Sequence, residues 1–175
     1  MLVKFQSLLG RGSSFKYFLT SAPYPEYLLR GNAAEICREH AHLFCSGRGV
    51  DVGASRWPFS DARKIEDTPD ENALRIKEAS ESLDYVFSSH CLEHIAAWKQ
   101  ALQEWIRVLK PGGVLYLYLP HPACEMWKPG NNPFHEWTPT PAVVAGELKS
   151  REMEIVEISY FPDVYFSFYV IARKS

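Results

Sequence analysis

The chain has 175 residues and a net charge of −2, and 46% of its residues are hydrophobic. This length predicts one domain with a sizeable core. Because no run of Lys and Arg stands out, the sequence lacks the basic footprint of a protein that binds nucleic acid or an anionic membrane.

Four scattered cysteines, none of them in a C-x-x-C pair, predict reduced thiols: Cys37, Cys45, Cys91 and Cys124. Residues 1–20 lack the continuous apolar core and the cleavage site of a signal peptide. No apolar run approaches the ~20 residues that a membrane-spanning helix needs. We therefore expect a cytoplasmic protein that does not enter a membrane.

Residues 1–46 are expected to form a helical segment that packs on the main domain, residues 47–175. Pro25 can begin a first helix. Apolar residues recur with helical spacing from Ala33 to Cys45, before Gly47 ends the helix. The chain is thus predicted to be a single domain with a helical N-terminal segment.

The next part of the chain is expected to contain short strands. The apolar run that ends at Gly53 predicts the first strand, and "LDYVFSS" is apolar on both faces, as in a buried parallel strand. The expected strands before the central helix are residues 49–53, 62–67, 72–76 and 83–89.

An amphipathic helix is expected over residues 95–109, because Trp98, Leu102 and Trp105 lie on one face of it. Pro111, in the "KPGG" stretch, is expected to end this helix. A second buried strand then follows.

The remainder of the chain predicts a loop over residues 121–137 and then a helix with Thr140 as its N-cap. Two strands, in residues 153–159 and 165–173, are joined closely enough to form an antiparallel pair. Strands alternating with helices before a terminal hairpin predict an α/β fold. We expect a Rossmann-like, doubly wound, mostly parallel sheet with a C-terminal antiparallel strand pair.

The stretch "SSHCLEHI" contains His-x-x-Glu-His, which on a helix is the signature of the inverted zinc peptidases. The strand-like residues before it place His90 at a strand end, so that His90 and His94 would not share a helix face. Carboxylates elsewhere leave a third ligand open: Glu125, Glu136 and Glu147. On balance no metal site is expected, and Glu93 and His94 are expected to cap the start of the following helix.

Several segments occur in one order: "GVDVGAS", "ARKIED", "LDYVFSSHCLEHI", "EWIRVLKPGGVLYLYLPH" and the final strand pair. Over about residues 47–172 they resemble the class I S-adenosylmethionine-dependent methyltransferases. The most specific part is "LDYVFSSHCLEHI" followed by "RVLKPGG". The resemblance implies that S-adenosylmethionine binds outside the carboxyl ends of the parallel strands.

The resemblance also implies the residues that hold this cofactor. Asp51 would orient its cationic amino group, and Gly53 would let the backbone approach it closely. Glu66, with Asp67 as the rival one position on, would accept hydrogen bonds from both ribose hydroxyls. The complete implied set is Asp51, Gly53, Ala54, Ser55, Glu66, Asp67, Asn72, Ala73, Ser88, Ser89 and His90.

Within this set, Asn72 and Ala73 would lie near the adenine, and the segment from Ser88 to His90 would pass beside the sulfonium and its methyl group. Two features depart from the family. Only one glycine remains in the loop after the first strand, and the segment between Asp51 and Glu66 is too short for a full helix. The alternative interpretation is therefore a methyltransferase-like scaffold or partner subunit with degraded cofactor binding.

Methyl transfer to oxygen needs a base near neutral pH, a role that suits histidine. The predicted topology brings His121, His90 and His135 to the carboxyl edge of the sheet, with His121 as first choice. The aromatic residues of the following loop could stack on an acceptor or pack the loop onto the domain: Trp127, Phe134 and Trp137. The stretch after the fourth strand is not the Asn/Asp-Pro-Pro-aromatic element of nitrogen methyltransferases. We expect a small molecule or glycan as acceptor, and no nucleic acid.

Overall fold

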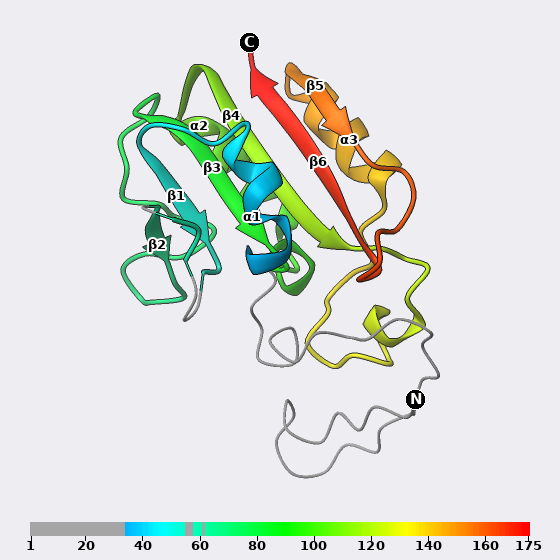
Figure 1. The fold of residues 1–175 in the computed structure, drawn as a ribbon. Coiled ribbons are helices and arrows are strands. Elements are labelled where there is room, and N and C mark those ends of the chain that lie inside the picture. Colours follow the sequence, from blue (N-terminus) through cyan, green and yellow to red (C-terminus); the bar gives the residue numbers. More distant parts are fainter. Residues whose placement is uncertain (1–33, 55–57, 61) are drawn as a thin grey trace.

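The computed structural model describes residues 34–54, 58–60 and 62–175, which form three layers (Figure 1). The predicted helix start at Pro25 and the candidate residue Ser55 lie outside the described residues. The strands are β1 Gly49–Val52, β2 Arg63–Ile65, β3 Leu83–Ser89, β4 Leu109–Pro120, β5 Met153–Ile158 and β6 Ser167–Lys174. The helices are α1 Ala34–His42, α2 Trp98–Val108 and α3 Pro141–Ser150, with 3₁₀ turns η2 Leu92–His94 and η3 Glu125–Trp127.

The described strands make one six-stranded sheet in the order β2-β1-β3-β4-β6-β5. Strands β2, β1, β3 and β4 are parallel, whereas β6 runs antiparallel to both β4 and β5. This topology confirms the predicted mostly parallel α/β sheet with a C-terminal antiparallel pair. The order also reverses at β1, because the chain passes from β1 to β2 on one side and returns to β3 on the other. Such a switch point is where α/β sheets bind ligands.

Each face of the sheet has its own apolar cluster. One cluster joins the sheet to α2 and α3, and Trp105 and Leu148 within it are fully buried. The other joins α1 to the opposite face, with Cys37 and Ala41 packed in one cluster with the stacked rings of Phe59 and Phe87. The described part of the N-terminal segment thus packs on the sheet, because its apolar positions recur at helical spacing.

Two details of the predicted secondary structure are wrong. Residues 72–76 form a tight turn instead of a strand, since the Asn72 side chain accepts a hydrogen bond from the amide of Leu74 and the backbones of Asn72 and Arg75 pair with each other. Asparagine competes with a strand ladder in this way. The strand that this region was expected to supply is therefore absent from the described sheet.

The central helix is also shorter than predicted. It begins at Trp98 rather than at Ile95 and ends at Val108 rather than at Leu109, and β4 follows at once. The Lys174 ammonium donates hydrogen bonds to the carbonyls of Ile106 and Leu109, which caps the end of the helix. The predicted N-cap of α3 is confirmed, because Thr140 Oγ1 accepts a hydrogen bond from the amide of Val143.

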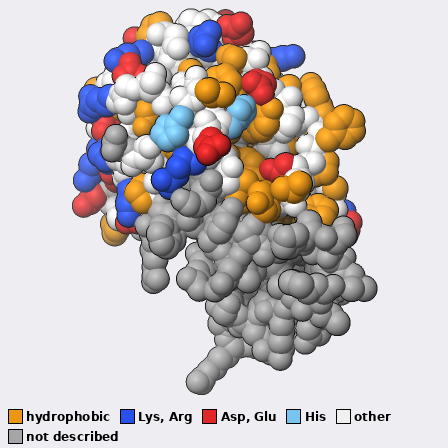
Figure 2. All heavy atoms as spheres, viewed as in Figure 1, with side chains coloured by type: hydrophobic (Ala, Val, Ile, Leu, Met, Phe, Trp, Pro, Cys, Tyr) orange, Lys and Arg blue, Asp and Glu red, His pale blue; other side chains and the backbone are white. Residues whose placement is uncertain are grey.

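The described surface mixes charges of both signs on the face drawn in Figure 2, where hydrophobic side chains gather toward the side of β5 and β6. The connection between these two strands carries exposed Tyr160, Phe161 and Val164. Among the described helices, none has the length and apolarity needed to span a bilayer. All four cysteines lie within the described residues, and none forms a disulfide.

Candidate active site at the carboxyl edge of the sheet

The parallel strands end together at one edge of the sheet. Val52 at the end of β1 is paired with Ile65 of β2 and with Ser88 of β3, and Ser89 is paired with Tyr118 of β4. The chain segments that follow these strands therefore meet at that edge. This brings together the predicted cofactor residues around Gly53, Glu66 and His90.

Asp51 is 1% exposed, and its Oδ2 accepts a hydrogen bond of 2.8 Å from the amide of Phe59. The carboxylate thereby anchors the short segment that connects β1 to β2. Burial raises the pKa of Asp51 to about 7, although the Phe59 amide and the nearby Lys64 act in the opposite direction. Asp51 thus has a local structural role, and its predicted contact with a cationic amino group stays a prediction.

Gly53 makes a turn that only glycine adopts easily. Its φ is +83°, and its amide donates a 2.9 Å hydrogen bond to the carbonyl of Ile65. A Cβ added at Gly53 would lie 2.5 Å from the sulfur of Cys91. The loop after β1 therefore packs directly against the loop after β3.

Two acids, Glu66 and Asp67, directly follow β2 at this edge. Glu66 and Asp67 are both exposed and directly follow Ile65, the last residue of the strand. The Asp67 carboxylate is one of the charges that raise the pKa of the Cys91 thiol, after the larger effect of burial. Both acids thus lie near the loops from β1 and β3, and the choice between them stays open.

The remaining predicted cofactor residues are held by local contacts. Asn72 belongs to the turn described above, and the carbonyl of Ala73 accepts a hydrogen bond from Trp105 Nε1. Ser88 is fully buried and donates to the carbonyl of Val52, which ties β3 to β1. Ala54 and Ser89 are buried beside them.

His90 turns the chain sharply at the end of β3. Its φ of +47° is rare for a residue with a side chain. The amide donates to the carbonyl of Tyr118, Nε2 lies 2.9 Å from Ser167 Oγ, and the ring packs edge-on against Trp127. Strained backbone of this kind concentrates at functional sites.

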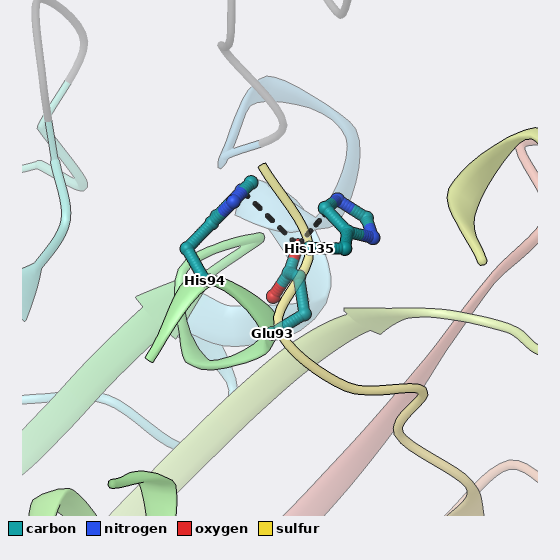
Figure 3. Close-up of side chains that lie close together, drawn as sticks. All are labelled: Glu93, His94 and His135. Carbon is teal, nitrogen blue, oxygen red and sulfur yellow. Dashed lines mark ion pairs between the residues drawn. The ribbon is translucent and has the colours of Figure 1, made fainter. Parts of the chain in front are cut away.

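Glu93 is the most unusual side chain of this edge. It is fully buried, and neither carboxylate oxygen has a hydrogen-bond partner among the described residues. Three ring nitrogens surround its Oε1: His90 Nδ1 at 3.5 Å, His94 Nε2 at 3.8 Å and His135 Nε2 at 3.9 Å. Figure 3 shows the carboxylate of Glu93 between the rings of His94 and His135.

The expectation that Glu93 and His94 cap the following helix is wrong. Helix α2 begins only at Trp98, and its N-cap, Ala97, makes no side-chain capping bond. Glu93 and His94 lie in the 3₁₀ turn η2, where Glu93 is buried. His90 and His94 do not share a helix, as expected. Glu93 and His94 lie close to His135, a residue that comes from a distant loop.

Burial determines the protonation of this cluster. It lowers the pKa of His90 to about 3 and of His135 to about 4, lowers the pKa of His94, and raises the pKa of Glu93 to about 8. The rings are therefore neutral at neutral pH. The close approaches to Glu93 are contacts with uncharged imidazoles rather than ion pairs.

The loop before α3 carries His135 into the cluster. The amide of Glu136 donates to the carbonyl of Glu93, and Trp137 Nε1 donates to the carbonyl of Leu92. The Trp137 ring also stacks on Trp98 at 4.2 Å between centroids. Trp137 thus packs the loop onto the domain, which is one of the two roles expected for the aromatic residues of this loop; the other was stacking on an acceptor.

His121, the first choice for a catalytic base, lies just after β4. Its Nε2 donates to the carbonyl of Tyr160, and its Nδ1 accepts from the amide of Ala123. Both ring nitrogens therefore have backbone partners, unlike Nε2 of His135. The role of His121 as a base stays a prediction.

Residues 31–117 match a family model described as a methyltransferase domain. Solved structures with a similar fold include a Haloferax volcanii methyltransferase in complex with a methyltransferase activator, at 14% identity and TM-score 0.60, covering 85% of this chain and 94% of that one. An Archaeoglobus fulgidus S-adenosylmethionine-dependent methyltransferase has 15% identity and TM-score 0.59, covering 86% and 95%. No curated protein matches in sequence.

A Burkholderia thailandensis 1,6-didemethyltoxoflavin-N1-methyltransferase, solved with 1,6-didemethyltoxoflavin and S-adenosylhomocysteine, has 17% identity and TM-score 0.55, covering 78% of this chain and 74% of that one. At these identities the likeness shows the fold. The sheet order and its carboxyl-edge site define a Rossmann-like methyltransferase fold. Residues 31–117, just under half of the chain, thus match a methyltransferase domain, and the fold is consistent with a class I S-adenosylmethionine-dependent methyltransferase.

Proposed function

We propose that the chain transfers a methyl group from S-adenosylmethionine to an oxygen atom of a small-molecule or glycan acceptor. The observation that carries this proposal is the buried Glu93 carboxyl among three neutral histidines at the carboxyl edge. An oxygen acceptor must lose a proton for methyl transfer, whereas a neutral amine attacks directly. Polar groups of this kind beside the switch point suit an oxygen acceptor.

The residues around the switch point fit the cofactor. Gly53 keeps the turn after β1 free of a side chain, and Glu66 presents an exposed carboxylate one residue after β2. Asp51 lies on β1 directly beside them. S-adenosylmethionine, when bound, supplies a methyl carbon activated by a positive sulfur. The residues of the chain would hold it and position the acceptor oxygen in line.

Among the three predicted catalytic histidines, His90 and His135 border the Glu93 cluster. Phe134, whose neighbour His135 enters the cluster, is 52% exposed. We therefore assign Phe134 to the acceptor side of the site, where its ring would stack on a sugar or an aromatic ring. Reduced cysteines, which form no disulfide, also favour the cytoplasm as the location.

A second candidate function is a scaffold or partner subunit with degraded cofactor binding. Its support is the short connection between β1, which ends at Val52, and β2, which begins at Arg63. Few residues remain there to enclose a cofactor. The similar Haloferax volcanii methyltransferase was solved with an activator protein.

Methyl transfer from radiolabelled S-adenosylmethionine to matched acceptors tests the proposed function. Panels of phenols and sugars should accept label, whereas the corresponding amines should not. Label found on amines alone would overturn oxygen as the acceptor atom. The variant His135→Gln should lower transfer to a hydroxyl acceptor without changing the affinity for S-adenosylhomocysteine.

Cofactor affinity should depend on pH through Asp51. A cationic amino group binds the ionised carboxylate, and burial raises the pKa of Asp51 to about 7. The affinity for S-adenosylhomocysteine should therefore be constant above pH 7 and fall about tenfold per pH unit below it. Calorimetric titrations at pH 6, 7 and 8 measure this dependence. Asp51→Asn should abolish it, and a dependence that survives in this variant would remove Asp51 from the site.

A further inference from the structure

The Glu93 carboxylate, His94 and His135 each offer one ligand atom, and these atoms all lie within 4.8 Å of one another. We propose that these three residues form a binding site for a divalent first-row transition-metal ion. Figure 3 shows both rings beside the Glu93 carboxylate, and the two rings also contact each other edge to face, with their centroids 4.7 Å apart. The residues come from the turn η2 and from the loop before α3, so the site joins two separate parts of the chain.

Both histidines are oriented as metal ligands are. His94 Nδ1 lies 2.7 Å from the carbonyl of Phe134, and His135 Nδ1 lies 2.5 Å from the carbonyl of Trp127. Because a carbonyl only accepts, each Nδ1 carries the proton and each Nε2 keeps a lone pair. Metal-bound histidines usually donate their second ring N–H to a backbone carbonyl or a carboxylate.

The two lone pairs and the carboxylate of Glu93 face one another without a donor between them. Among the described residues, neither Glu93 oxygen has a hydrogen-bond partner. A proton on Glu93 does not resolve this in the present arrangement, because even the nearest ring nitrogen, His90 Nδ1 at 3.5 Å, makes no hydrogen bond with it, and the two Nε2 atoms lie at 3.8 and 3.9 Å. A cation between the three groups satisfies all of them.

The separations also fit one ion. Bonds of about 2.1 Å from a metal to nitrogen or oxygen allow two ligand atoms to lie at most about 4.2 Å apart. The distances from Glu93 Oε1 to His94 Nε2 and His135 Nε2 are 3.8 and 3.9 Å. All three ligand atoms lie within 4.8 Å of one another, which is slightly more than this limit, so the side chains would rotate to bring their ligand atoms closer to the ion.

The chemistry of the ligands selects the metal. Two imidazoles and one carboxylate favour Zn²⁺, Fe²⁺ or Co²⁺ over Mg²⁺ and Ca²⁺, which prefer oxygen ligands alone. Three protein ligands leave at least one coordination position open, which is typical of catalytic rather than structural sites. The His94 side chain is 40% exposed, so that a further ligand can reach the ion from solvent.

On the proposed methyltransferase function, the open position would bind the acceptor hydroxyl. A bound cation lowers the pKa of an oxygen ligand, and the hydroxyl proton leaves to solvent. The oxygen then forms a bond to the methyl carbon while the carbon–sulfur bond breaks, and the sulfur becomes a neutral thioether. The acceptor class is therefore a hydroxyl compound that can ligate a metal.

Calorimetric titration of the chelator-treated full chain with ZnCl₂ tests the site, and CoCl₂ supplies a visible absorption spectrum. Wild-type protein should bind one ion per chain. Glu93→Gln and His135→Ala should each weaken Zn²⁺ binding at least about 100-fold. The control His42→Asn, which changes an exposed histidine bonded to Ser60, should leave Zn²⁺ binding unchanged.

Absence of binding to the wild type, or equal binding by both variants, would overturn the metal site. If either variant fails to fold, Zn²⁺ added to the wild type should still shift the ring resonances of His94 and His135 but not those of His42. Titration with S-adenosylhomocysteine separates the two proposals. Metal binding without cofactor binding contradicts the proposed function alone, and the reverse contradicts the metal site alone.

Discussion

Replacing Glu66 with alanine should lower the affinity for S-adenosylhomocysteine at least about 100-fold. The carboxylate follows β2 directly and is exposed at the edge where β1, β2 and β3 end. It would accept hydrogen bonds from both ribose hydroxyls, and bonds to a charged group contribute about 1.5–3 kcal/mol each. Calorimetric titration of the variant measures the loss.

Asp67→Ala is the matched control, because it removes an exposed carboxylate one position further on. We expect this variant to bind S-adenosylhomocysteine within about threefold of the wild type, since it would lose only an exposed, largely screened charge and no hydrogen bond to the ribose. The opposite pattern would move the ribose site to Asp67. Unchanged affinity in both variants would show that the ribose lies elsewhere.

Gly53→Ala should destabilise the protein by about 2–5 kcal/mol and lower its cofactor affinity. Two effects add at this position. The φ of +83° costs an alanine backbone strain, and the new Cβ would meet Cys91 Sγ at 2.5 Å. Relief of that clash moves the loops after β1 and β3 apart, and both are predicted to border the cofactor. Denaturant unfolding and calorimetric titration measure the two losses.

Gly112→Ala separates the two effects. Gly112 has a similar φ of +78°, but a Cβ there would meet no described atom within 4 Å. This variant should be destabilised only by backbone strain, by about 1–2 kcal/mol, and should keep its cofactor affinity. Equal losses in the two variants would mean that the contact between Gly53 and Cys91 has no energetic consequence.

The fold was predictable because its strongest signals are local. "LDYVFSS" is apolar on both faces and became β3, which is buried in the centre of the sheet. Thr140 followed by Pro141 marked the start of α3 in the same way. The failures arose where a side chain or a distant residue competed with local preference. Asn72 folded its own backbone into a turn, and the distant Glu136 and Trp137 donate to carbonyls of the 3₁₀ turn before α2, which begins only at Trp98.

The site was only partly predictable for a similar reason. The residues after β1, β2 and β3 could be placed at one edge, because parallel strands end together. The meeting of Glu93 with His135 could not, since it depends on hydrogen bonds and ring stacking that dock a long loop through Glu136 and Trp137. The His-x-x-Glu-His pattern was the available signal. The preceding strand separates His90 from the helix, as predicted, but the 3₁₀ turn that follows brings Glu93 and His94 together with the distant His135.

The most direct test of the central claim is calorimetric titration of the full wild-type chain with S-adenosylhomocysteine, together with thermal unfolding in its presence. The arrangement of Asp51, Gly53 and Glu66 at the switch point predicts one molecule bound per chain and a raised unfolding temperature. No heat and no thermal shift at millimolar ligand would contradict cofactor binding. The chain would then be a methyltransferase-like scaffold.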